Sequence, residues 1–175
     1  ILIKATESTV DHGFQIIPDS VKINVNDLDS LELTEISASA FAEYQGKADI
    51  TNLTIGAKVK KIGDNAFKGY SNLKELHIEG ANTIGKYAFQ SCSNLNKIWL
   101  PNTLTTIGEK AFEYCNAISH VISKVASPSA MGYEIFSIPD NNKATLFVPS
   151  ANGYTIGSWT QFSNVVEMGA GDYDT

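Results

Sequence analysis

The chain has 175 residues, of which 43% are hydrophobic and 18% charged, which is enough apolar material for one folded domain. Its 19 acidic and 13 basic side chains give a net charge of −6 without a run of Lys or Arg, which argues against nucleic acid or an anionic membrane as partner. No stretch reaches about 18 consecutive apolar residues, so no membrane-inserted segment is predicted. Ile1-Leu2-Ile3-Lys4 lacks the layout of a signal peptide, and we expect a processed or truncated start.

Residues 1–27 are predicted to be an N-terminal lead-in that holds a degenerate repeat. Ile17-Pro18-Asp19-Ser20-Val21 has the register of the later Leu100-Pro101-Asn102-Thr103-Leu104, in which a strand exit precedes a turn. Residues 14–23 are therefore interpreted as a worn copy that lacks the phenylalanine half of the repeat described next.

A six-residue motif, Ile-Gly-x-x-Ala-Phe, recurs through the middle of the chain. Three copies are complete and the first is degenerate: Ile36-Ser37-Ala38-Ser39-Ala40-Phe41, Ile62-Gly63-Asp64-Asn65-Ala66-Phe67, Ile84-Gly85-Lys86-Tyr87-Ala88-Phe89 and Ile107-Gly108-Glu109-Lys110-Ala111-Phe112. Successive copies start 26, 22 and 23 residues apart. This period falls within the range of about 20 to 29 residues that is typical of leucine-rich repeats. The predicted fold is an α/β solenoid, a right-handed coil of about five short-strand repeats with N- and C-terminal capping segments.

A second pattern, apolar-x-x-apolar-x-apolar, keeps step with the first and predicts one strand for each repeat. Its occurrences are Leu28-x-x-Leu31-x-Leu33, Ile50-x-x-Leu53-x-Ile55, Leu73-x-x-Leu76-x-Ile78, Leu95-x-x-Ile98-x-Leu100 and Ile118-x-x-Val121-x-Ser123. The final apolar-x-apolar step has the period of two that a strand with one buried face requires. Residues 28–123 are accordingly predicted to be the repeat region.

The regular spacing of the motif along the chain predicts how one coil packs on the next. We expect the phenylalanines to stack as a ladder inside the solenoid, because a single coil cannot bury its own apolar face. Gly63, Gly85 and Gly108 form a column that indicates a tight corner. Two reasons for glycine remain open there: a positive φ, or a place where a side chain would strike the neighbouring coil.

The chain after Ser127-Pro128 departs from the repeat and is rich in aromatic residues. Residues 124–168 are predicted to be a C-terminal repeat and a cap over the last coil, built from Ile135-Phe136, Thr145-Leu146-Phe147-Val148-Pro149, Tyr154, Trp159, Phe162 and Val165-Val166-Glu167-Met168. Residues 169–175 are polar and acidic and are predicted to be a disordered tail.

These features together resemble the BspA-like group of leucine-rich-repeat proteins, surface proteins of Bacteroides-type bacteria and of some protists. The units that carry the resemblance are Ile107-Gly-x-x-Ala-Phe-x-x-Cys-x-x-Ile118, Leu95-x-x-Ile98-x-Leu100-Pro101 and the ending Ala144-Thr-Leu-Phe-Val-Pro149 with Trp159-x-x-Phe162. The resemblance implies a secreted or cell-surface protein, with some members acting as adhesins for host matrix proteins. It transfers no ligand, because repeat motifs specify the scaffold and leave exposed positions free.

Cys92 and Cys115 occupy one repeat position, where Tyr70 stands in the preceding copy. Adjacent coils at strand-like spacing of roughly 5 Å would allow a disulfide. We instead expect buried free thiols, because the position also accommodates Tyr and a free cysteine behaves as a small hydrophobe. Two cysteines without Cys-x-x-Cys spacing predict no zinc site.

Residue patterns that would support catalysis, a metal or a cofactor are missing from the sequence. His12, His77 and His120 fall in different repeat registers without an acidic cluster, and no Gly-x-Ser-x-Gly elbow is present. Asp64, Lys86 and Glu109 share one column of adjacent repeats and are interpreted as surface pairs between coils. The sequence therefore predicts no enzyme, no metal and no cofactor.

The side chains between the inward strand positions give the clearest functional signal. They form the outward pairs Ser30/Glu32, Asn52/Thr54, Glu75/His77, Lys97/Trp99 and His120/Ile122. Trp99 and Ile122 are large apolar groups where solubility would favour polar ones, so Glu75, His77, Lys97, Trp99, His120 and Ile122 are proposed as a ligand-binding patch. The alternative is that Trp99 packs under the N-terminal segment or the cap, or is an isolated exposed aromatic side chain.

Three classes of function remain at this point. A non-catalytic binding module at the cell surface, for an unidentified host or extracellular-matrix protein or glycan, is favoured by the repeat and the patch. A structural spacer or partner domain of a larger surface protein is the alternative. An enzyme ranks third, because no catalytic motif supports it.

Overall fold

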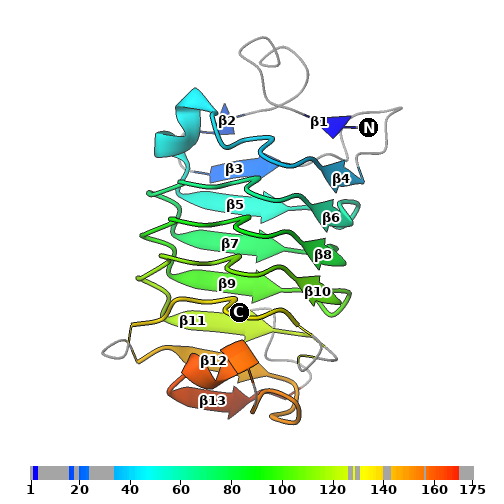
Figure 1. Ribbon diagram of the computed structural model, residues 1–175, viewed down its shortest axis with the longest axis vertical. Helices are drawn as coiled ribbons and strands as arrows, with labels where there is room; N and C mark the ends of the chain where they lie inside the picture. Colours follow the sequence, from blue (N-terminus) through cyan, green and yellow to red (C-terminus); the bar gives the residue numbers. More distant parts are fainter. Residues whose placement is uncertain are drawn as a thin grey trace.

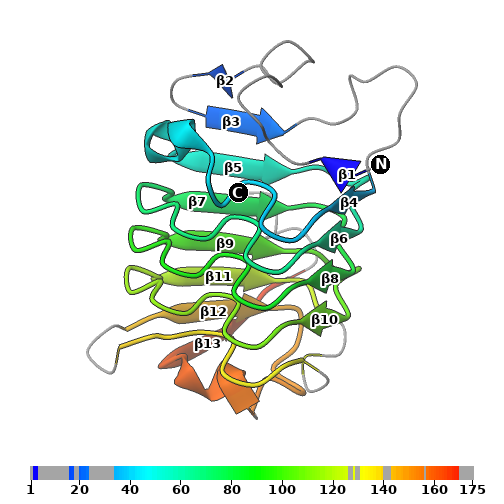
Figure 2. The same ribbon diagram turned by 45° about the horizontal axis from the view of Figure 1, so that its top comes forward.

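The computed structural model describes residues 2–3, 16–17, 20–23, 34–125, 128, 131–139, 143–155 and 157–169. They form a solenoid in which the coils stack along the longest axis of the molecule (Figures 1 and 2). The helical elements are short 3-10 turns, η3 (Gln45–Asp49) and η5 (Gly157–Gln161), and the described residues contain no α-helix. The predicted solenoid is thus confirmed. It contains very little helix, although the predicted fold class was α/β.

The solenoid contains two sheets, and the shorter one ends at β10. The long sheet contains eight strands in the spatial order β13-β12-β11-β9-β7-β5-β3-β2, and the short sheet five in the order β1-β4-β6-β8-β10. The long-sheet strands are β2 (Ile16–Ile17), β3 (Ser20–Ile23), β5 (Asn52–Ile55), β7 (Glu75–Ile78), β9 (Lys97–Leu100), β11 (His120–Ser123), β12 (Thr145–Val148) and β13 (Asn164–Glu167). The short-sheet strands are β1 (Leu2–Ile3), β4 (Glu35–Ile36), β6 (Lys61–Ile62), β8 (Thr83–Ile84) and β10 (Thr106–Ile107).

Neighbouring coils pair in parallel and in register, which stacks equivalent residues on each other. Leu53 pairs with Leu76, and the column continues through Ile98, Val121 and Leu146, all of which are buried. The exception is the antiparallel pairing of β2 with β3. Because the side chains of a strand alternate between its two faces, this register places one set in the core and the other on the outer face of the long sheet.

Four of the five predicted strands are present as β5, β7, β9 and β11. The fifth, Leu28-x-x-Leu31-x-Leu33, lies outside the described residues and stays a prediction, while β5 pairs with β3 on the side away from β7. Val21, predicted to stand after a turn, pairs in that strand with Leu53. The register predicted for residues 14–23 was therefore wrong, because apolar spacing marks residues suited to a strand but does not say which segment pairs with a given neighbour.

The phenylalanine ladder is confirmed and runs one coil further than predicted. Phe41, Phe67, Phe89, Phe112 and Phe136 stack in sequence, with ring centroids 5.1 to 5.4 Å apart. Phe136 closes a degenerate copy of the motif, Met131-Gly132-Tyr133-Glu134-Ile135-Phe136, in which Met and Ile replace Ile and Ala. Trp159 and Phe162 then meet Phe136 edge-on at 5.4 and 5.2 Å and end the ladder.

The glycine column exists because of close approach between coils. None of the three motif glycines has a positive φ. A Cβ on Gly85 would stand 2.5 Å from the backbone nitrogen of Asp64 and 2.6 Å from the carbonyl carbon of Gly63. The left-handed conformation falls instead two residues later, on Asn65, Tyr87 and Lys110 with φ 56° and on Glu134 with φ 50°.

Cys92 and Cys115 are free and fully buried, as expected. Their thiols donate to backbone carbonyls of the preceding coil, Cys92 to Phe67 at 3.5 Å and Cys115 to Phe89 at 3.2 Å. The hydroxyl of Tyr70 donates to the Phe41 carbonyl in the same way, at 3.1 Å. The repeat position therefore selects for a side chain that fills the core and carries a donor at its tip.

The C-terminal residues extend the solenoid as well as closing it. Strand β12 pairs in register with β11, and β13 pairs in register with β12, so residues 145–148, predicted as part of the aromatic close, form a strand of the long sheet. The Trp159 indole N–H donates to the Pro128 carbonyl at 2.9 Å, which ties η5 to the preceding turn. The predicted tail beyond Gly169 lies outside the described residues, and the proposed domain limits at residues 27 and 123 stay predictions.

Candidate functional site

All six predicted patch residues lie on the outer face of the long sheet and are partly exposed. They come from the first and third positions of β7, β9 and β11, whose second and fourth positions are buried. Parallel, in-register pairing sorts the outward residues into two rows that run across the strands, along the solenoid axis.

The first row, here called the polar row, consists of Glu75, Lys97, His120, Thr145 and Asn164. Glu75 and Lys97 form an ion pair of 3.8 Å, with side chains 37% and 44% exposed. The His120 Nδ1 lies 2.6 Å from the Ser119 hydroxyl. Exposed ion pairs of this kind contribute about 0 to 1 kcal/mol, so the polar row shapes the surface more than it stabilises the fold.

The second row, here called the sheet-face stripe, consists of His77, Trp99, Ile122, Phe147 and Val166. The imidazole of His77 stacks on the indole of Trp99, with ring centroids 3.8 Å apart and planes 13° apart. Ile122 stands on the strand at the other side of Trp99 and is followed by Phe147. Trp99 is therefore one member of a continuous row and not an isolated aromatic side chain.

Sequence reasoning missed Phe147 and Val166, because residues 145–168 were interpreted as a cap. The alternation in β12 carries the signal that would have found Phe147: Leu146 and Val148 are buried, so Phe147 must face outward. Its ring also stacks on His120 of the polar row, with centroids 5.8 Å apart and planes 9° apart. The two histidines of the patch thus each cover an aromatic ring.

Stacking has an electrostatic consequence for His77. Burial lowers the pKa of its imidazole below the ordinary value, because the charged form loses water, while the nearby carboxylates of Glu75 and Glu79 partly oppose the shift. The neutral form is therefore favoured at neutral pH, and the stripe carries little charge of its own.

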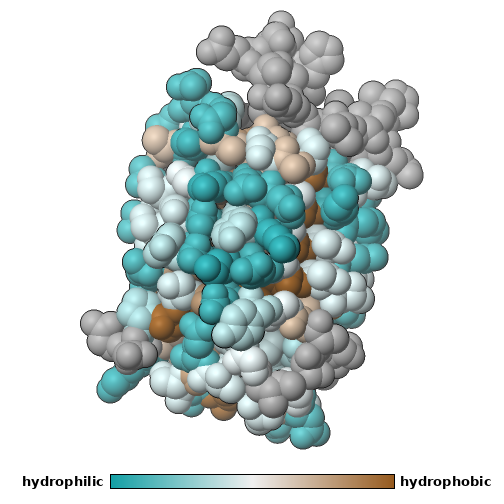
Figure 3. Space-filling model, in the orientation of Figure 1, coloured by the Kyte–Doolittle hydropathy of each residue, from teal (hydrophilic) through white to brown (hydrophobic). Residues whose placement is uncertain are grey.

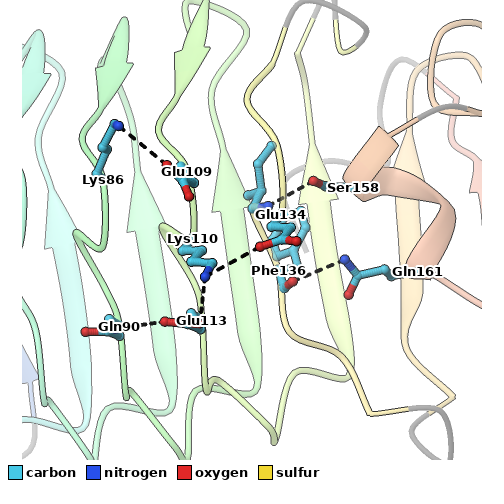
Figure 4. Close-up of polar contacts among 10 residues, drawn as sticks. Lys86, Gln90, Glu109, Lys110, Glu113, Glu134, Phe136, Ser158 and Gln161 are labelled. Carbon is cyan, nitrogen blue, oxygen red and sulfur yellow. Dashed lines mark hydrogen bonds and ion pairs between the residues drawn. The ribbon is translucent and has the colours of Figure 1, made fainter.

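A different face of the molecule, over the coil segments that follow the short strands, is mainly hydrophilic (Figure 3). Lys110 forms ion pairs of 3.6 Å with both Glu113 and Glu134, and Gln90 donates to Glu113 (Figure 4). The sequence had predicted surface pairs in this region for Asp64, Lys86 and Glu109. Lys86 and Glu109 do pair, at 3.4 Å. Asp64 differs, because its carboxylate accepts the backbone N–H of Lys86 at 2.8 Å.

Hydrogen bonds within this region also hold the last coils together. Ser158 accepts the backbone N–H of Ile135 at 2.9 Å, and the Gln161 side-chain amide donates to the Phe136 carbonyl at 3.1 Å (Figure 4).

In the described part of the chain, no three His, Cys, Asp or Glu side chains lie close enough to hold a metal ion. No helix there is long and apolar enough to cross a membrane.

Stacked parallel coils with an inner apolar column and a repeat of 22 to 26 residues define a leucine-rich-repeat solenoid. The model of a family described as a BspA type leucine rich repeat region matches residues 15–158 in six copies, and the chain belongs to this family. No curated protein matches the chain.

Solved structures of bacterial leucine-rich-repeat proteins are similar to this one. A T. pallidum leucine rich repeat protein shares 20% identity over 85% of this chain and 69% of its own, with a TM-score of 0.61. A leucine rich cell surface protein from Faecalibacterium prausnitzii shares 21% identity over 76% of this chain and 38% of its own, with a TM-score of 0.48. A Bacteroides ovatus leucine-rich repeat protein shares 16% identity over 78% of this chain and 46% of its own, with a TM-score of 0.35. At such identities the likeness concerns the fold alone.

Proposed function

We propose that this chain is a non-catalytic binding module that holds a protein ligand on the outer face of its long sheet, at a cell surface or after secretion. Membership of a leucine-rich-repeat family supports a role in protein interaction, because such solenoids offer extended surfaces with freely variable exposed positions. The proposed location rests on what the resemblance to the BspA-like group implies.

The observation that carries the proposal is the sheet-face stripe. Trp99, Ile122 and Phe147 follow one another on three paired strands, at positions where solubility alone would favour polar side chains. Continuous rows of partly exposed aromatic and aliphatic groups with polar neighbours are typical of recognition surfaces. The polar row beside the stripe supplies the kind of rim such a surface requires.

The orientation of the rings favours a protein over a glycan as ligand. Sugars pack their apolar C–H groups on the face of an aromatic ring, where the negative side of the quadrupole lies. One face of Trp99 is occupied by His77, and its other side is flanked by Ile122. Phe147 is flanked by Ile122 and Val166 and stacks on His120. The stripe therefore offers ring edges and aliphatic groups, which suit apolar protein side chains.

Replacement of stripe residues tests the function directly. The immobilised chain is screened against purified extracellular-matrix proteins and a glycan array, and any ligand retained is then measured with Trp99→Ala and Phe147→Ser. We expect each variant to weaken binding about tenfold or more, the loss typical of a central interface residue. Tyr133→Ser is the matched control, because Tyr133 is 73% exposed but lies outside the stripe.

The alternative function, a structural spacer or partner domain of a larger surface protein, predicts a different result. A ligand whose affinity is the same for the native chain, Trp99→Ala and Phe147→Ser would exclude the stripe as its binding site. Retention of no protein at all would favour the spacer. Thermal unfolding of each variant shows whether a lost affinity reflects a lost fold.

A further inference from the structure

The sheet-face stripe is straight and one residue wide. Its five members are in register on β7, β9, β11, β12 and β13, so the stripe runs perpendicular to the strands. With neighbouring strands about 4.8 Å apart, it extends for about 19 Å. A ligand that covers the whole stripe must present apolar groups along a line at nearly that spacing.

An α-helix meets this requirement better than an extended peptide. One side of a helix offers an apolar group every turn, about 5.4 Å apart, and a helix of about 13 residues spans the stripe. Its mismatch with the strand spacing is about 0.6 Å per step, which adds up to about 2.4 Å over the four steps of the stripe. An extended peptide offers side chains on one side every 6.6 to 6.8 Å or so, so its mismatch is about 2 Å per step and already about 4 Å after two steps. A peptide that instead ran along the strands would cross the stripe only once.

Charges beside the stripe constrain the partner further. Lys97 and His120 lie in the polar row, and Lys124 follows directly after β11 on the other flank. Glu75 and Glu79 stand at the β7 end, both close enough to influence His77. The middle of the stripe is therefore flanked by basic groups, and its β7 end by acidic ones. The positive N-terminus of a helix is best placed at that acidic end, with acidic side chains further along.

We propose, as a refinement that rests on the proposed function, that the stripe binds an amphipathic α-helix of a partner protein. The helix lies along the solenoid axis with its N-terminus over β7. Its apolar residues recur at i, i+3 or i+4, and i+7 against Trp99, Ile122 and Phe147. Its acidic residues flank these positions opposite Lys97 and Lys124.

Two peptide display libraries of matched composition test this proposal with the native chain. One fixes its residues in a helical scaffold and the other in an extended hairpin, and both are selected against the chain with a Trp99→Ser variant as the counter-target. We expect enrichment from the helical library only, with Asp and Glu beside the apolar positions. The affinity of the enriched peptides should fall at least tenfold on Trp99→Ser.

Charge reversal supplies a readout that does not depend on the stability of the Trp99 variant. Lys97→Glu combined with Lys124→Glu should weaken the enriched helix at least tenfold, and replacing the acidic residues of the peptide by Lys should restore binding. Lys86→Glu, on another face, is the matched control and should change nothing.

The possible outcomes separate this inference from the function on which it rests. Enrichment from the hairpin library alone overturns the helix and leaves a protein-binding stripe intact. Helical peptides that bind the native chain and the charge-reversed variant equally overturn the proposed polarity of the partner. Binding of a glycan alone, or of no ligand that distinguishes the native chain from Trp99→Ser, overturns the proposed function together with the helix.

Discussion

The indole of Trp99 lies flat against the imidazole of His77, with ring centroids 3.8 Å apart and planes inclined by 13°. This contact contributes to the burial that lowers the pKa of His77. Trp99→Ala should therefore raise the pKa of His77 towards its ordinary value of about 6.5, because water regains access to the charged ring. An NMR titration of the imidazole protons measures the shift. Ile122→Ala, two strands from His77, is the control and should leave that pKa unchanged.

The same pKa shift predicts how stability depends on pH. The unfolded chain binds a proton at His77 near pH 6.5, whereas the folded chain binds it only at lower pH. Between these two pKa values the unfolded state holds more protons, so the free energy of unfolding falls as the pH decreases. His77→Gln should therefore lose less stability than the native chain between pH 7.5 and pH 5, as measured by urea unfolding. A larger loss in the variant would contradict the assignment.

The phenylalanine ladder predicts a large cost for a truncation in its middle. Phe89 is fully buried between the rings of Phe67 and Phe112, at 5.4 and 5.3 Å. Phe89→Ala should lower the free energy of unfolding by about 3 to 5 kcal/mol, because packed coils on both sides limit collapse into the cavity. Tyr114→Ala removes a ring that is 55% exposed and should cost no more than about 0.5 kcal/mol. Equal losses of unfolding free energy for the two variants, measured in urea, would mean that the ladder does not stabilise the core.

The ladder is also the part of the fold that the sequence predicts best. Three copies of Ile-Gly-x-x-Ala-Phe at almost equal spacing leave few ways to arrange Phe67, Phe89 and Phe112 except one above another. The fifth copy was missed because Met131 and Ile135 replace the motif residues, although Gly132 still marks the corner. The short strands were not predicted either, since a two-residue strand has no periodicity to read.

The sequence predicts which residues of the candidate site face outward, because this depends on alternation, but it does not predict their side-chain geometry. The outward positions of His77 and Trp99 follow from the period of a strand, and so does their register across two repeats. That the two rings stack, and so turn their edges outward, depends on rotamers that no pattern in one sequence specifies. The β3 neighbour of β5 was missed because Leu28-x-x-Leu31-x-Leu33 has the stronger apolar spacing.

Two glycines allow the steric and conformational roles of glycine to be separated. Gly85→Ala places a Cβ within 2.6 Å of backbone atoms of the preceding coil, although the backbone of Gly85 suits any residue. Gly69 has φ +81°, but a Cβ added there would meet only the flexible end of the Lys47 side chain, at 3.7 Å. Gly69→Ala should therefore cost only about 1 to 2 kcal/mol, the price of a left-handed conformation. Gly85→Ala should cost more, because two coils must separate.

The comparison of the two variants is made by urea unfolding, with Gly69→Asn as a third variant. Ser91 and Tyr114 occupy the equivalent left-handed position with φ 62° and 61°, which shows that the repeat tolerates side chains there. Asn adopts this conformation readily, so Gly69→Asn should be close to neutral. A Gly85→Ala variant as stable as Gly69→Asn would show that the coils are less tightly apposed than the structure has them.

Ser123 and Tyr154 form a buried polar contact at a position that the other repeats fill with apolar groups. Ser123 ends β11 where Ile55, Ile78 and Leu100 end theirs, and it is fully buried. Its hydroxyl lies 2.8 Å from that of Tyr154, which also lies 3.0 Å from the Val125 carbonyl. Tyr154→Phe removes a hydroxyl from this set, so buried polar atoms of Ser123 and Val125 lose a partner. The free energy of unfolding should fall by about 1 to 3 kcal/mol.

A double-mutant cycle with Ser123→Val determines whether the loss comes from this contact. Val matches the apolar strand ends of the other repeats. Once Tyr154 is Phe, the Ser123 hydroxyl keeps only the contact with the Val125 backbone N–H at 3.4 Å, so Ser123→Val then costs less. The double variant should therefore be more stable than the sum of the two single losses predicts, by about 0.5 kcal/mol or more. Additive losses would mean that Tyr154 acts through its ring packing on Trp159, at 5.0 Å, and not through its hydroxyl.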